Sequence, residues 1–435
     1  MSKIFKFPNG FLWGAATSAH QVEGNNHNDW TEWEHTNSAR LAAEAARRHT
    51  NAPTRIPDYI LNNYPNPLQE ENYISGRACD HYNRYGEDFG LVKEMGHNAH
   101  RFSIEWSRIE PEEGKFNQDE IEHYRKVILA LRERGIEPFV TLWHWTMPVW
   151  FVKKGGFEKS GNIKYFVRFC EYIVKEFSAQ GESASGGKDD ITYWITLNEP
   201  EIYSVNSYLK GIWPPQKKNL IPYLSVIVNL IKAYHESYKI IKKINPGAQV
   251  GIAKNNIYFE AHRNKVHNLM LKKFIDWWWN FYFLNCIKNH QDFIGLNHYF
   301  HNRIKNFKFN QNENKKVSDM GWELYPEAIY YVLKSLKKYH KPIYITENGL
   351  ADAKDENREW FIKESLQNIH KAIAEGVDVK GYFHWSLLDN FEWDKGFWPR
   401  FGLVEIDYET LERKPRPSSR VYAEIAKANA VEIND

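Results

Sequence analysis

The segment Ile191-Thr-Tyr-Trp-Ile-Thr-Leu197 runs directly into Asn198-Glu199-Pro200. A short apolar run rich in β-branched and aromatic residues is typical of a buried strand. A carboxylate placed immediately after such a strand costs free energy of desolvation unless it is solvated or has a function. The same arrangement recurs where Pro342-Ile-Tyr-Ile-Thr346 runs into Glu347. The sequence therefore predicts two strands that each present a glutamate at the carboxyl end.

Short apolar segments recur along the whole chain and alternate with helical patterns. One helix is predicted from residue 163 to residue 177, where apolar residues follow the i, i+3, i+4, i+7 spacing of a single face. A second begins after Asn117, with Glu120 in the capping-box position, and a third ends at Gly376. The apolar segments are residues 11–16, 98–104, 138–143, 192–197, 250–253, 293–296, 343–346 and 381–385. Eight repeats of strand then helix predict an α/β fold, a (β/α)8 (TIM) barrel forming a single domain over residues 1–435.

Two segments fall outside this alternation. Residues 178–190 are rich in Gly and Ser and predict a surface loop. Residues 34–75 carry four prolines and are interpreted as a long loop after the first strand. Because barrels place their active-site loops at the carboxyl ends of the strands, this second loop is a candidate wall of a substrate pocket.

Polar and aromatic side chains gather at the predicted carboxyl ends of the strands. They are His20-Gln21, residues 101–105, His144-Trp145, residues 198–200, residues 297–299, residues 347–349 and residues 385–393. Nearly all of them can hydrogen-bond or stack. Two glutamates on separate strands can face each other across the mouth of a barrel, which is the geometry that glycoside hydrolysis requires.

The composition fits a sugar ligand better than a charged polymer. The chain holds 17 Trp, 25 Tyr and 25 Phe, and flat rings with a polar edge suit the C–H faces of polyhydroxylated molecules, although most of these rings are expected in the core. With 57 basic and 55 acidic residues interleaved, no long run of one sign arises. The sequence therefore makes no electrostatic case for nucleic acid or an anionic membrane surface.

Cellular location is predicted from segments that the sequence lacks. No stretch approaches the roughly 18-residue apolar run of a membrane span, and the first residues have no apolar core of a signal peptide. The three cysteines, Cys79, Cys170 and Cys286, are too few and scattered for a disulfide framework or a zinc site. We expect a cytoplasmic protein in a reducing compartment.

Five long motifs resemble those of glycoside hydrolase family 1, in order and in spacing. They are the segments 11–24 (FLWGAATSAHQVEG), 101–108 (RFSIEWSR), 196–200 (TLNEP), 345–349 (ITENG) and 385–393 (WSLLDNFEW). The resemblance covers nearly the whole chain, from Phe7 to about Ala426, and five motifs together are far more specific than any one of them. It implies a retaining, exo-acting β-glycosidase, whereas composition and periodicity alone give only a barrel with paired glutamates.

The resemblance implies a mechanism in which Glu347 is the nucleophile and Glu199 the acid/base. In retaining enzymes the two carboxyl groups lie about 5 to 5.5 Å apart. Glu347 has to be ionised, and Arg101, Asn297 and Tyr299 resemble the residues that orient it. Glu199 has to start protonated, with its pKa raised by burial and by the other carboxylate. When Glu347 is esterified that repulsion falls, so Glu199 can act as a base toward water.

The resemblance also implies the sugar-binding residues. Gln21, His144, Asn198 and Glu392 correspond to ligands of the sugar hydroxyls, with Asn198 at the 2-hydroxyl. Trp385 and Trp393 correspond to a stacking platform and a hydroxyl donor. Candidates for the leaving-group side are Trp145, Trp322 and Phe401, for which core packing is an equal alternative. His144 could also be a core histidine, and either glutamate alone could be a structural carboxylate.

Other functions are weighed on particular residues. A metal-dependent amidohydrolase would show His-x-His on its first strand, where this chain has Ala19-His20-Gln21. A non-catalytic sugar-binding barrel would lack one of the glutamates. The pairs His97/His100 and His298/His301 have no accompanying carboxylate pattern, so neither a metal nor another cofactor is expected. A 6-phospho-β-glycosidase would carry a serine-containing loop and a lysine in place of the end of the last motif, and Glu392 would repel a phosphate.

The connection between the fifth and sixth predicted strands is the one segment that departs from the resemblance. Residues 255–291 are shorter than expected and contain Trp277, Trp278 and Trp279 in succession. Three consecutive residues span about 200° of a helix, which is wider than one buried stripe. We expect at least one indole to face away, as part of an apolar surface or crevice remote from the sugar site. The alternative is that residues 302–319 fold over it.

Overall fold

Eight parallel strands close into a barrel in the order β10, β11, β2, β3, β4, β5, β6, β8. The computed structural model describes residues 3–50, 56–62, 65–178, 187 and 189–433. The barrel strands are β2 (Leu12–Ala16), β3 (Ala99–Ser103), β4 (Glu137–Thr141), β5 (Tyr193–Asn198), β6 (Gln249–Asn255), β8 (Phe293–Asn297), β10 (Ile343–Asn348) and β11 (Val379–Trp385). Each overlaps one of the eight apolar segments, so the predicted barrel is confirmed.

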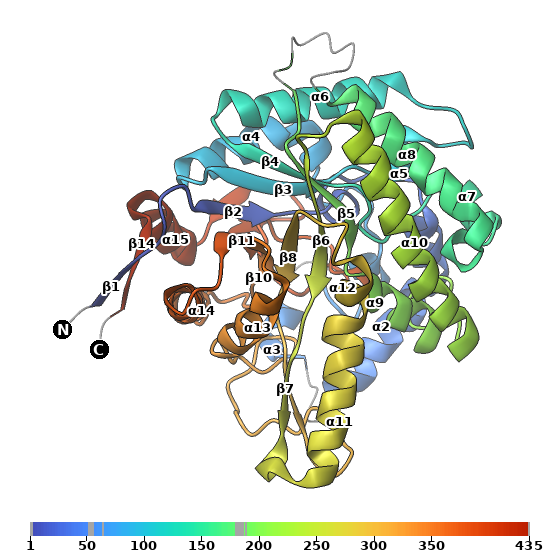
Figure 1. The fold of residues 1–435 in the computed structure, drawn as a ribbon. Helices are drawn as coiled ribbons and strands as arrows, with labels where there is room; N and C mark the ends of the chain where they lie inside the picture. The colour runs from blue at the N-terminus through green and yellow to red at the C-terminus, as the bar shows by residue number, and fades with distance from the viewer. Residues whose placement is uncertain (1–2, 51–55, 63–64, 179–186, 188, 434–435) are drawn as a thin grey trace.

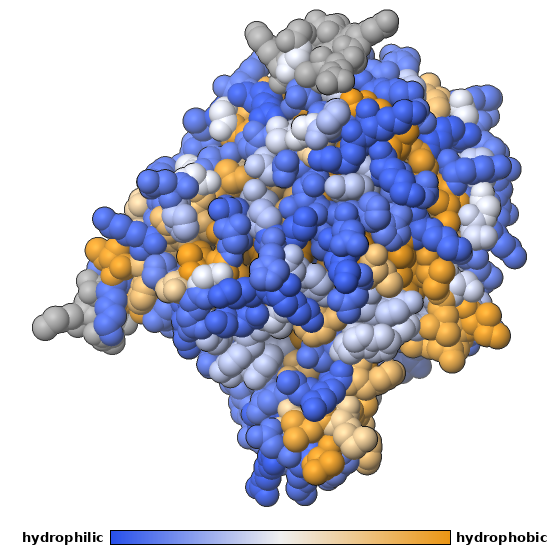
Figure 2. All heavy atoms as spheres, in the orientation of Figure 1, coloured by the Kyte–Doolittle hydropathy of each residue, from blue (hydrophilic) through white to orange (hydrophobic). Residues whose placement is uncertain are grey.

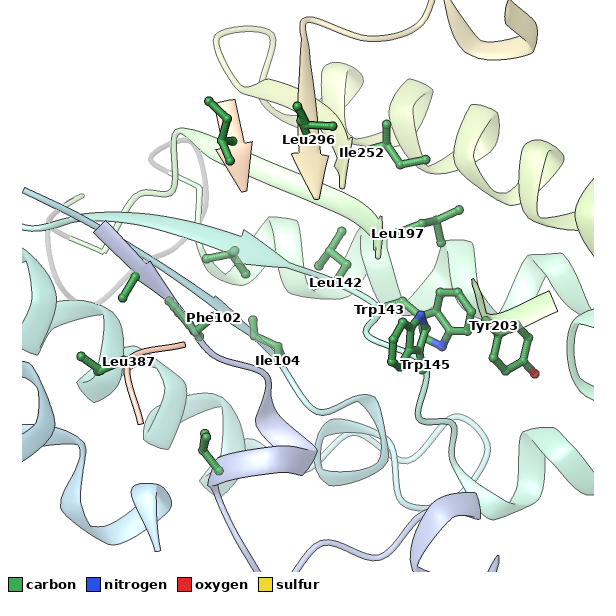
Figure 3. Packing of buried hydrophobic residues seen from close by; sticks show 14 of the residues in the cluster. Phe102, Ile104, Leu142, Trp143, Trp145, Leu197, Tyr203, Ile252, Leu296 and Leu387 are labelled. Carbon is green, nitrogen blue, oxygen red and sulfur yellow. The ribbon is translucent and has the colours of Figure 1, made fainter. Parts of the chain in front are cut away.

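The strands are nearly continuous apolar runs because they are buried on both faces. In β6, Ala253 packs inside the barrel with Phe139 and Phe293, while Ile252 belongs to the larger cluster between strands and helices. Figure 3 shows part of that outer cluster, including Ile252. Gly251 faces the ring of Phe293 so closely that an added Cβ would lie 2.6 Å from it. Glycine at this position therefore makes room for the aromatic filling of the barrel.

Helices cover the outside of the barrel (Figure 1). In α8 the predicted apolar face is buried, including Phe166, Cys170 and Ile173. It packs against α10, the longest helix of the described chain. The covering helices are α4 (His81–Glu94), α6 (Gln118–Glu133), α8 (Ile163–Glu176), α10 (Leu220–Ile244), α12 (Tyr282–Ile287), α13 (Ala328–Leu336), α14 (Arg358–Ala374) and α15 (Pro417–Ala428).

Several elements lie outside the barrel itself. Strands β1 (Lys3–Lys6) and β14 (Ala430–Ile433) pair antiparallel and bring the two ends of the chain together (Figure 1). Strands β7 (Tyr258–Ala261) and β9 (His301–Ile304) pair in parallel and, with α11 (Val266–Asp276), project from one side of the barrel (Figure 1). The remaining short elements are α1 (Ala19–Val22), α3 (Asp58–Leu61), α5 (Trp106–Ile109), α7 (Val149–Lys153), α9 (Pro200–Ser204), β12 (Val404–Ile406) and β13 (Arg413–Pro415).

The interpretation of residues 34–75 as one long loop is wrong. Helix α2 spans Asp29–Thr50, and its stretch 38–48 is rich in Ala, Glu and Arg, which favour helices. The prolines come only after this helix ends. The predicted loop at residues 178–190 lies mostly outside the described residues. Among the helices that are described, none is both long and apolar enough to cross a membrane.

Candidate active site

Glu199 lies at the carboxyl end of β5, as predicted. Its backbone has φ 40° in the left-handed region, and Pro200 starts α9 immediately after it. The side chain is 4% exposed, and its Oε1 accepts hydrogen bonds from Asn297 (2.9 Å) and Asn255 (3.1 Å). The sharp turn between strand and helix thus directs a buried carboxyl group into the mouth of the barrel.

Burial and the neighbouring charge of Glu347 together raise the pKa of Glu199 to about 8, against hydrogen bonds that favour the ionised form. At neutral pH the group is therefore mainly protonated. This is the protonation state that a general acid needs at the start of a reaction.

Glu347 lies on β10 and has a different set of partners. Its Oε1 accepts a hydrogen bond from Arg101 at 2.5 Å, and its Oε2 accepts one from the hydroxyl of Tyr299 at 2.7 Å. Burial raises the pKa of Glu347, while the charge of Arg101 and the hydrogen bonds from Tyr299 and Arg101 lower it. The guanidinium and the phenol therefore favour the carboxylate form and fix its orientation, as predicted for these two residues.

Asn198 links the two glutamates. Its Oδ1 accepts hydrogen bonds from Arg101 (2.6 Å) and from Asn297 (3.1 Å), and its Nδ2 donates to Nε2 of His144 (3.0 Å). Asn297, which was predicted to orient Glu347, donates to Glu199, and a hydrogen bond from its side chain also lowers the pKa of Glu347. The predicted residues thus form one connected network across β3, β5, β8 and β10.

His144 is a neutral imidazole, and one of its two ring nitrogens has no hydrogen-bond partner among the described residues. Burial lowers its pKa well below the ordinary value, with Arg101 adding to the effect. Because Nε2 accepts from Asn198, the proton lies on Nδ1, and within the described chain that atom is buried without a hydrogen-bond partner. An unpaired buried donor in a cavity is an expected contact for a ligand hydroxyl.

A cavity of about 380 Å³ contains both glutamates. The predicted residues that line it are His144, Trp145, Glu199, Tyr299, Trp322, Glu347, Trp385, Glu392, Trp393 and Phe401. Gln21 lies behind the wall, where its Nε2 donates to the backbone oxygen of Phe391 at 2.9 Å and to Glu392 at 3.3 Å. Gln21 therefore holds Glu392 in place in this structure.

Asn255 and Trp213 are among the residues of the site that were missed from the sequence. Asn255 donates to Glu199, and it follows the apolar run by which the fifth strand was recognised, so reading that strand two residues further would have found it. Trp213 lines the cavity between Trp145 and Trp393 and donates its indole N–H to Asp394 at 2.8 Å. It comes from a connection without periodicity, and no sequence signal distinguished it.

The three consecutive tryptophans have three different environments. Trp277 is 45% exposed, as expected for at least one of them. Trp278 stacks on Tyr282 and donates to the hydroxyl of Tyr223 at 3.0 Å. Trp279 lines the cavity that contains the glutamates, so the expectation that this cluster is wholly remote from the sugar site is wrong. The π-helical turn Trp277–Phe281 turns successive indoles in different directions.

A buried ion pair lies behind the part of the cavity that Trp279 lines. The ammonium group of Lys254 lies 3.2 Å from Oε1 of Glu201 and donates to the backbone oxygens of Asn255 and Trp279, each at 2.7 Å. The nearby carboxylate of Glu201 favours the protonated form of Lys254, although burial lowers the pKa of Lys254. The pair joins α9, which follows Glu199, to β6 and to the turn that carries Trp279.

We expect Lys254→Met to lower the free energy of unfolding by about 3–5 kcal/mol, because it leaves Glu201 buried and uncompensated. The double variant Lys254→Met/Glu201→Leu should be more stable than Lys254→Met alone, since it removes both charges. Denaturant unfolding of both variants and of Glu201→Leu measures this. If the double variant lost as much free energy of unfolding as the two single variants lose together, the two side chains would not interact.

The histidines of the second pair have hydrogen-bond partners within the protein, whereas neither ring nitrogen of His97 has one among the described residues. His301 lies between Glu323 (2.6 Å) and Glu260 (3.1 Å), and His298 contacts the backbone oxygen of Asn256 (2.9 Å). Within the described residues, no group of three or more His, Cys, Asp or Glu side chains is placed to hold a metal ion.

Known proteins match the chain along its whole length. The family model for glycosyl hydrolase family 1 matches residues 4–285 and 268–431. β-Glucosidase A of Thermotoga maritima is 33% identical over 479 aligned residues, which cover 99% of both chains. The structure of a β-glycosidase from Pyrococcus horikoshii superposes with a TM-score of 0.84 at 37% identity, over 100% of this chain and 97% of that one. A T. maritima β-glucosidase in complex with glucoimidazole gives 0.82 at 31% identity, over 98% and 99%. The chain therefore belongs to glycosyl hydrolase family 1.

Proposed function

We propose that the protein is a retaining β-glycosidase in which Glu347 is the nucleophile and Glu199 the acid/base. The observation that carries this is the pair itself. One cavity holds a carboxyl group whose pKa is raised to about 8 and a second one held by a guanidinium and a phenol. Two titratable groups whose environments separate their roles in this way are typical of an acid and a nucleophile.

The reaction proceeds in two displacements. A carboxylate oxygen of Glu347 forms a bond to the anomeric carbon while the bond to the leaving oxygen breaks, and the proton of Glu199 passes to that oxygen. The alcohol departs. Esterification removes the negative charge of Glu347, which lowers the proton affinity of Glu199. Glu199 then takes a proton from water, whose oxygen displaces Glu347 from the anomeric carbon and regenerates both groups.

The cavity wall divides into two sides. We assign Gln21, His144, Asn198, Glu392, Trp385 and Trp393 to the cleaved sugar, with the free Nδ1–H of His144 as a donor to one of its hydroxyls. Trp145, Trp322 and Phe401 are assigned to the leaving group. Trp322 packs against Tyr299 and Phe401, so this aromatic wall begins beside the nucleophile. The wall offers flat apolar contact more than hydrogen bonds, which suits varied leaving groups.

Glycosides of unphosphorylated sugars are the proposed substrates, with β-glucosides first and β-galactosides and β-fucosides also accepted. Relatives named β-glucosidase support β-glucosides as substrates. Burial raises the pKa of Glu392 to about 8, so repulsion of a phosphate by its charge is a weaker argument than the sequence indicated. The lysine Lys395, which lies nearby, is paired with Asp394. Lys210 also lines the cavity, so the names of the relatives are what favours unphosphorylated sugars.

The remaining predictions are retained as proposals. The mechanism uses only side chains of this chain, so no cofactor is required for it. We regard residues 1–435 as one catalytic domain, and a reducing, cytoplasmic location is consistent with three free cysteines. A non-catalytic sugar-binding protein is disfavoured because both carboxyl groups are present and held as catalysis requires.

Following the first-formed product by NMR tests the proposal. With a p-nitrophenyl β-glucoside, the sugar released first should have the β configuration, because two displacements restore the starting geometry. A panel of aryl β-glycosides compared by kcat/KM then ranks the sugars, and the α-glucoside serves as the matched negative control. Release of the α anomer first would contradict the retaining mechanism.

A further inference from the structure

Two segments that are separate in sequence are both rich in Lys and Arg. Residues 262–275 and 303–317, here called the basic tip, contain nine Lys and Arg residues and one acidic residue, Glu313. The net charge of the whole chain is only +2. The rest of the molecule is therefore net negative, although residues 202–259 also carry eight Lys residues and only one acidic residue. The sequence interpretation missed this because neither segment is a long run of one sign.

The fold makes one surface of these two segments. Strands β7 and β9 pair in parallel, with β7 ending just before the first segment and β9 leading into the second. Asn268 on α11 then accepts a hydrogen bond from the backbone N–H of Asn306 at 2.9 Å, and the ring of His267 lies 5.3 Å from that of Phe307. Figure 1 shows this unit projecting from the barrel. Arg303 forms ion pairs with Glu260 and Glu313, whereas Lys265, Lys305 and Lys308 are exposed.

The basic tip also exposes a stripe of apolar side chains. Val266, Met270 and Phe274 are 73%, 68% and 59% exposed, and with Trp277 they repeat at the spacing of one helical face. Phe307 on the second segment is 68% exposed. Figure 2 shows the apolar side chains at this end of the molecule, bordered by hydrophilic ones. Single exposed apolar residues are ordinary, whereas a contiguous stripe on a helix indicates a binding surface.

We propose that the basic tip binds the surface of a lipid bilayer that contains anionic headgroups. Apolar and aromatic side chains on one face of a helix, with Lys and Arg around them, are the features by which helices lie in the plane of a membrane interface. The apolar stripe enters the boundary between headgroups and acyl chains, while the Lys and Arg side chains contact the phosphates. The association is peripheral and is independent of any membrane-spanning helix.

Other occupants fit these observations less well. A second copy of the chain would bring two strongly positive surfaces together, and like charges across an interface oppose association. A nucleic acid would satisfy the charges but would leave Val266, Met270 and Phe274 without an apolar partner. An anionic bilayer satisfies both kinds of side chain at once.

The tip adjoins the cavity of the candidate active site. Asn302, on β9, and Asn310, within the tip, both line that cavity, and their side chains are hydrogen-bonded to each other at 2.7 Å. Docking of the tip therefore places the mouth of the cavity close to the membrane surface.

Co-sedimentation with vesicles tests the proposal on the full chain. We expect binding to vesicles of equimolar phosphatidylglycerol and phosphatidylcholine, little binding to phosphatidylcholine alone, and release by about 1 M salt, where the Debye length falls to about 3 Å. Absence of binding to the anionic vesicles would overturn the proposal. Equal binding to both kinds of vesicle, unaffected by salt, would also overturn it.

Variants separate the tip from the rest of the surface. Met270→Ser/Phe274→Ser, and separately the reversal to Glu of Lys272, Lys273, Lys305 and Lys308, should each weaken vesicle binding by about tenfold or more. Hydrolysis of a soluble aryl glycoside should stay unchanged in both, which shows that they fold. The matched controls are Ile221→Ser/Leu224→Ser on α10 and reversal to Glu of the exposed Lys126, Lys232, Lys243 and Lys288.

Two outcomes of this series would contradict the proposal. Control variants that lose as much binding as the tip variants would show that the charge of the whole molecule, not the tip, is responsible. The second outcome would come from sedimentation velocity of the protein without vesicles. A dimer that dissociates on Met270→Ser/Phe274→Ser would show that a second copy occupies the stripe instead.

Discussion

Glu347→Ala is expected to lower kcat by roughly 10⁴-fold or more, because the residue that forms the covalent bond is lost. Added azide should restore part of the activity. Removing the carboxylate leaves a small space beside the anomeric carbon, opposite an intact Glu199 that can still protonate the leaving group. Azide attacks once from that space, so the product is an α-glycosyl azide, of inverted configuration. NMR of the product measures this directly.

The matched control for that rescue is Glu392→Ala, which removes another, half-buried carboxyl group from the same cavity. It should weaken substrate binding, yet azide should not restore its activity, because Glu347 is still present. A β-glycosyl azide from Glu347→Ala would contradict the assignment of Glu347 as the nucleophile, since that product requires two displacements and hence another nucleophile in the protein.

Glu199→Gln is expected to have an effect that depends on the leaving group. General-acid help matters most when the departing oxygen is basic, so kcat/KM should fall by roughly 10²–10⁴-fold for alkyl glycosides and far less for dinitrophenyl glycosides. Loss of activity on the alkaline side should also disappear in the variant. In the wild type that loss follows deprotonation of a group with a pKa of about 8, which must be protonated to act as an acid.

Azide provides an internal check on the second variant. In Glu199→Gln the glycosyl-enzyme still forms from activated substrates, and azide can attack it without a general base, so the product is a β-glycosyl azide. The two variants treated with the same anion should therefore give products of opposite configuration. If kcat/KM of Glu199→Gln fell equally across leaving groups of different pKa, Glu199 would not be the acid.

The barrel and the two glutamates of its cavity could be predicted from the sequence because their signals are local. Barrel strands are buried on both faces, so each is a short apolar run, and a glutamate directly after such a run is conspicuous. Arg101 and Tyr299 were likewise identified from motifs, and they lie on Glu347 as expected.

Other features could not be predicted because they depend on where distant segments meet. The prolines between residues 53 and 67 outweighed the helix-forming residues of α2 in the sequence interpretation. Trp213 comes from an irregular connection, and only the fold places it beside Trp145. The basic tip is invisible in a linear charge plot, since β7 and β9 have to pair before its two halves become one surface.

The outer part of the cavity bears on the fate of the glycosyl-enzyme. Ile202, Val205 and Ile212 line the same cavity as the two glutamates, so an alcohol can remain against these side chains after the first displacement. Such an alcohol competes with water for the proton-accepting Glu199, and its capture yields a new glycoside instead of free sugar. The ratio of synthesis to hydrolysis should then rise with the apolar size of the alcohol supplied, which would make the protein a catalyst for joining sugars to hydrophobic acceptors.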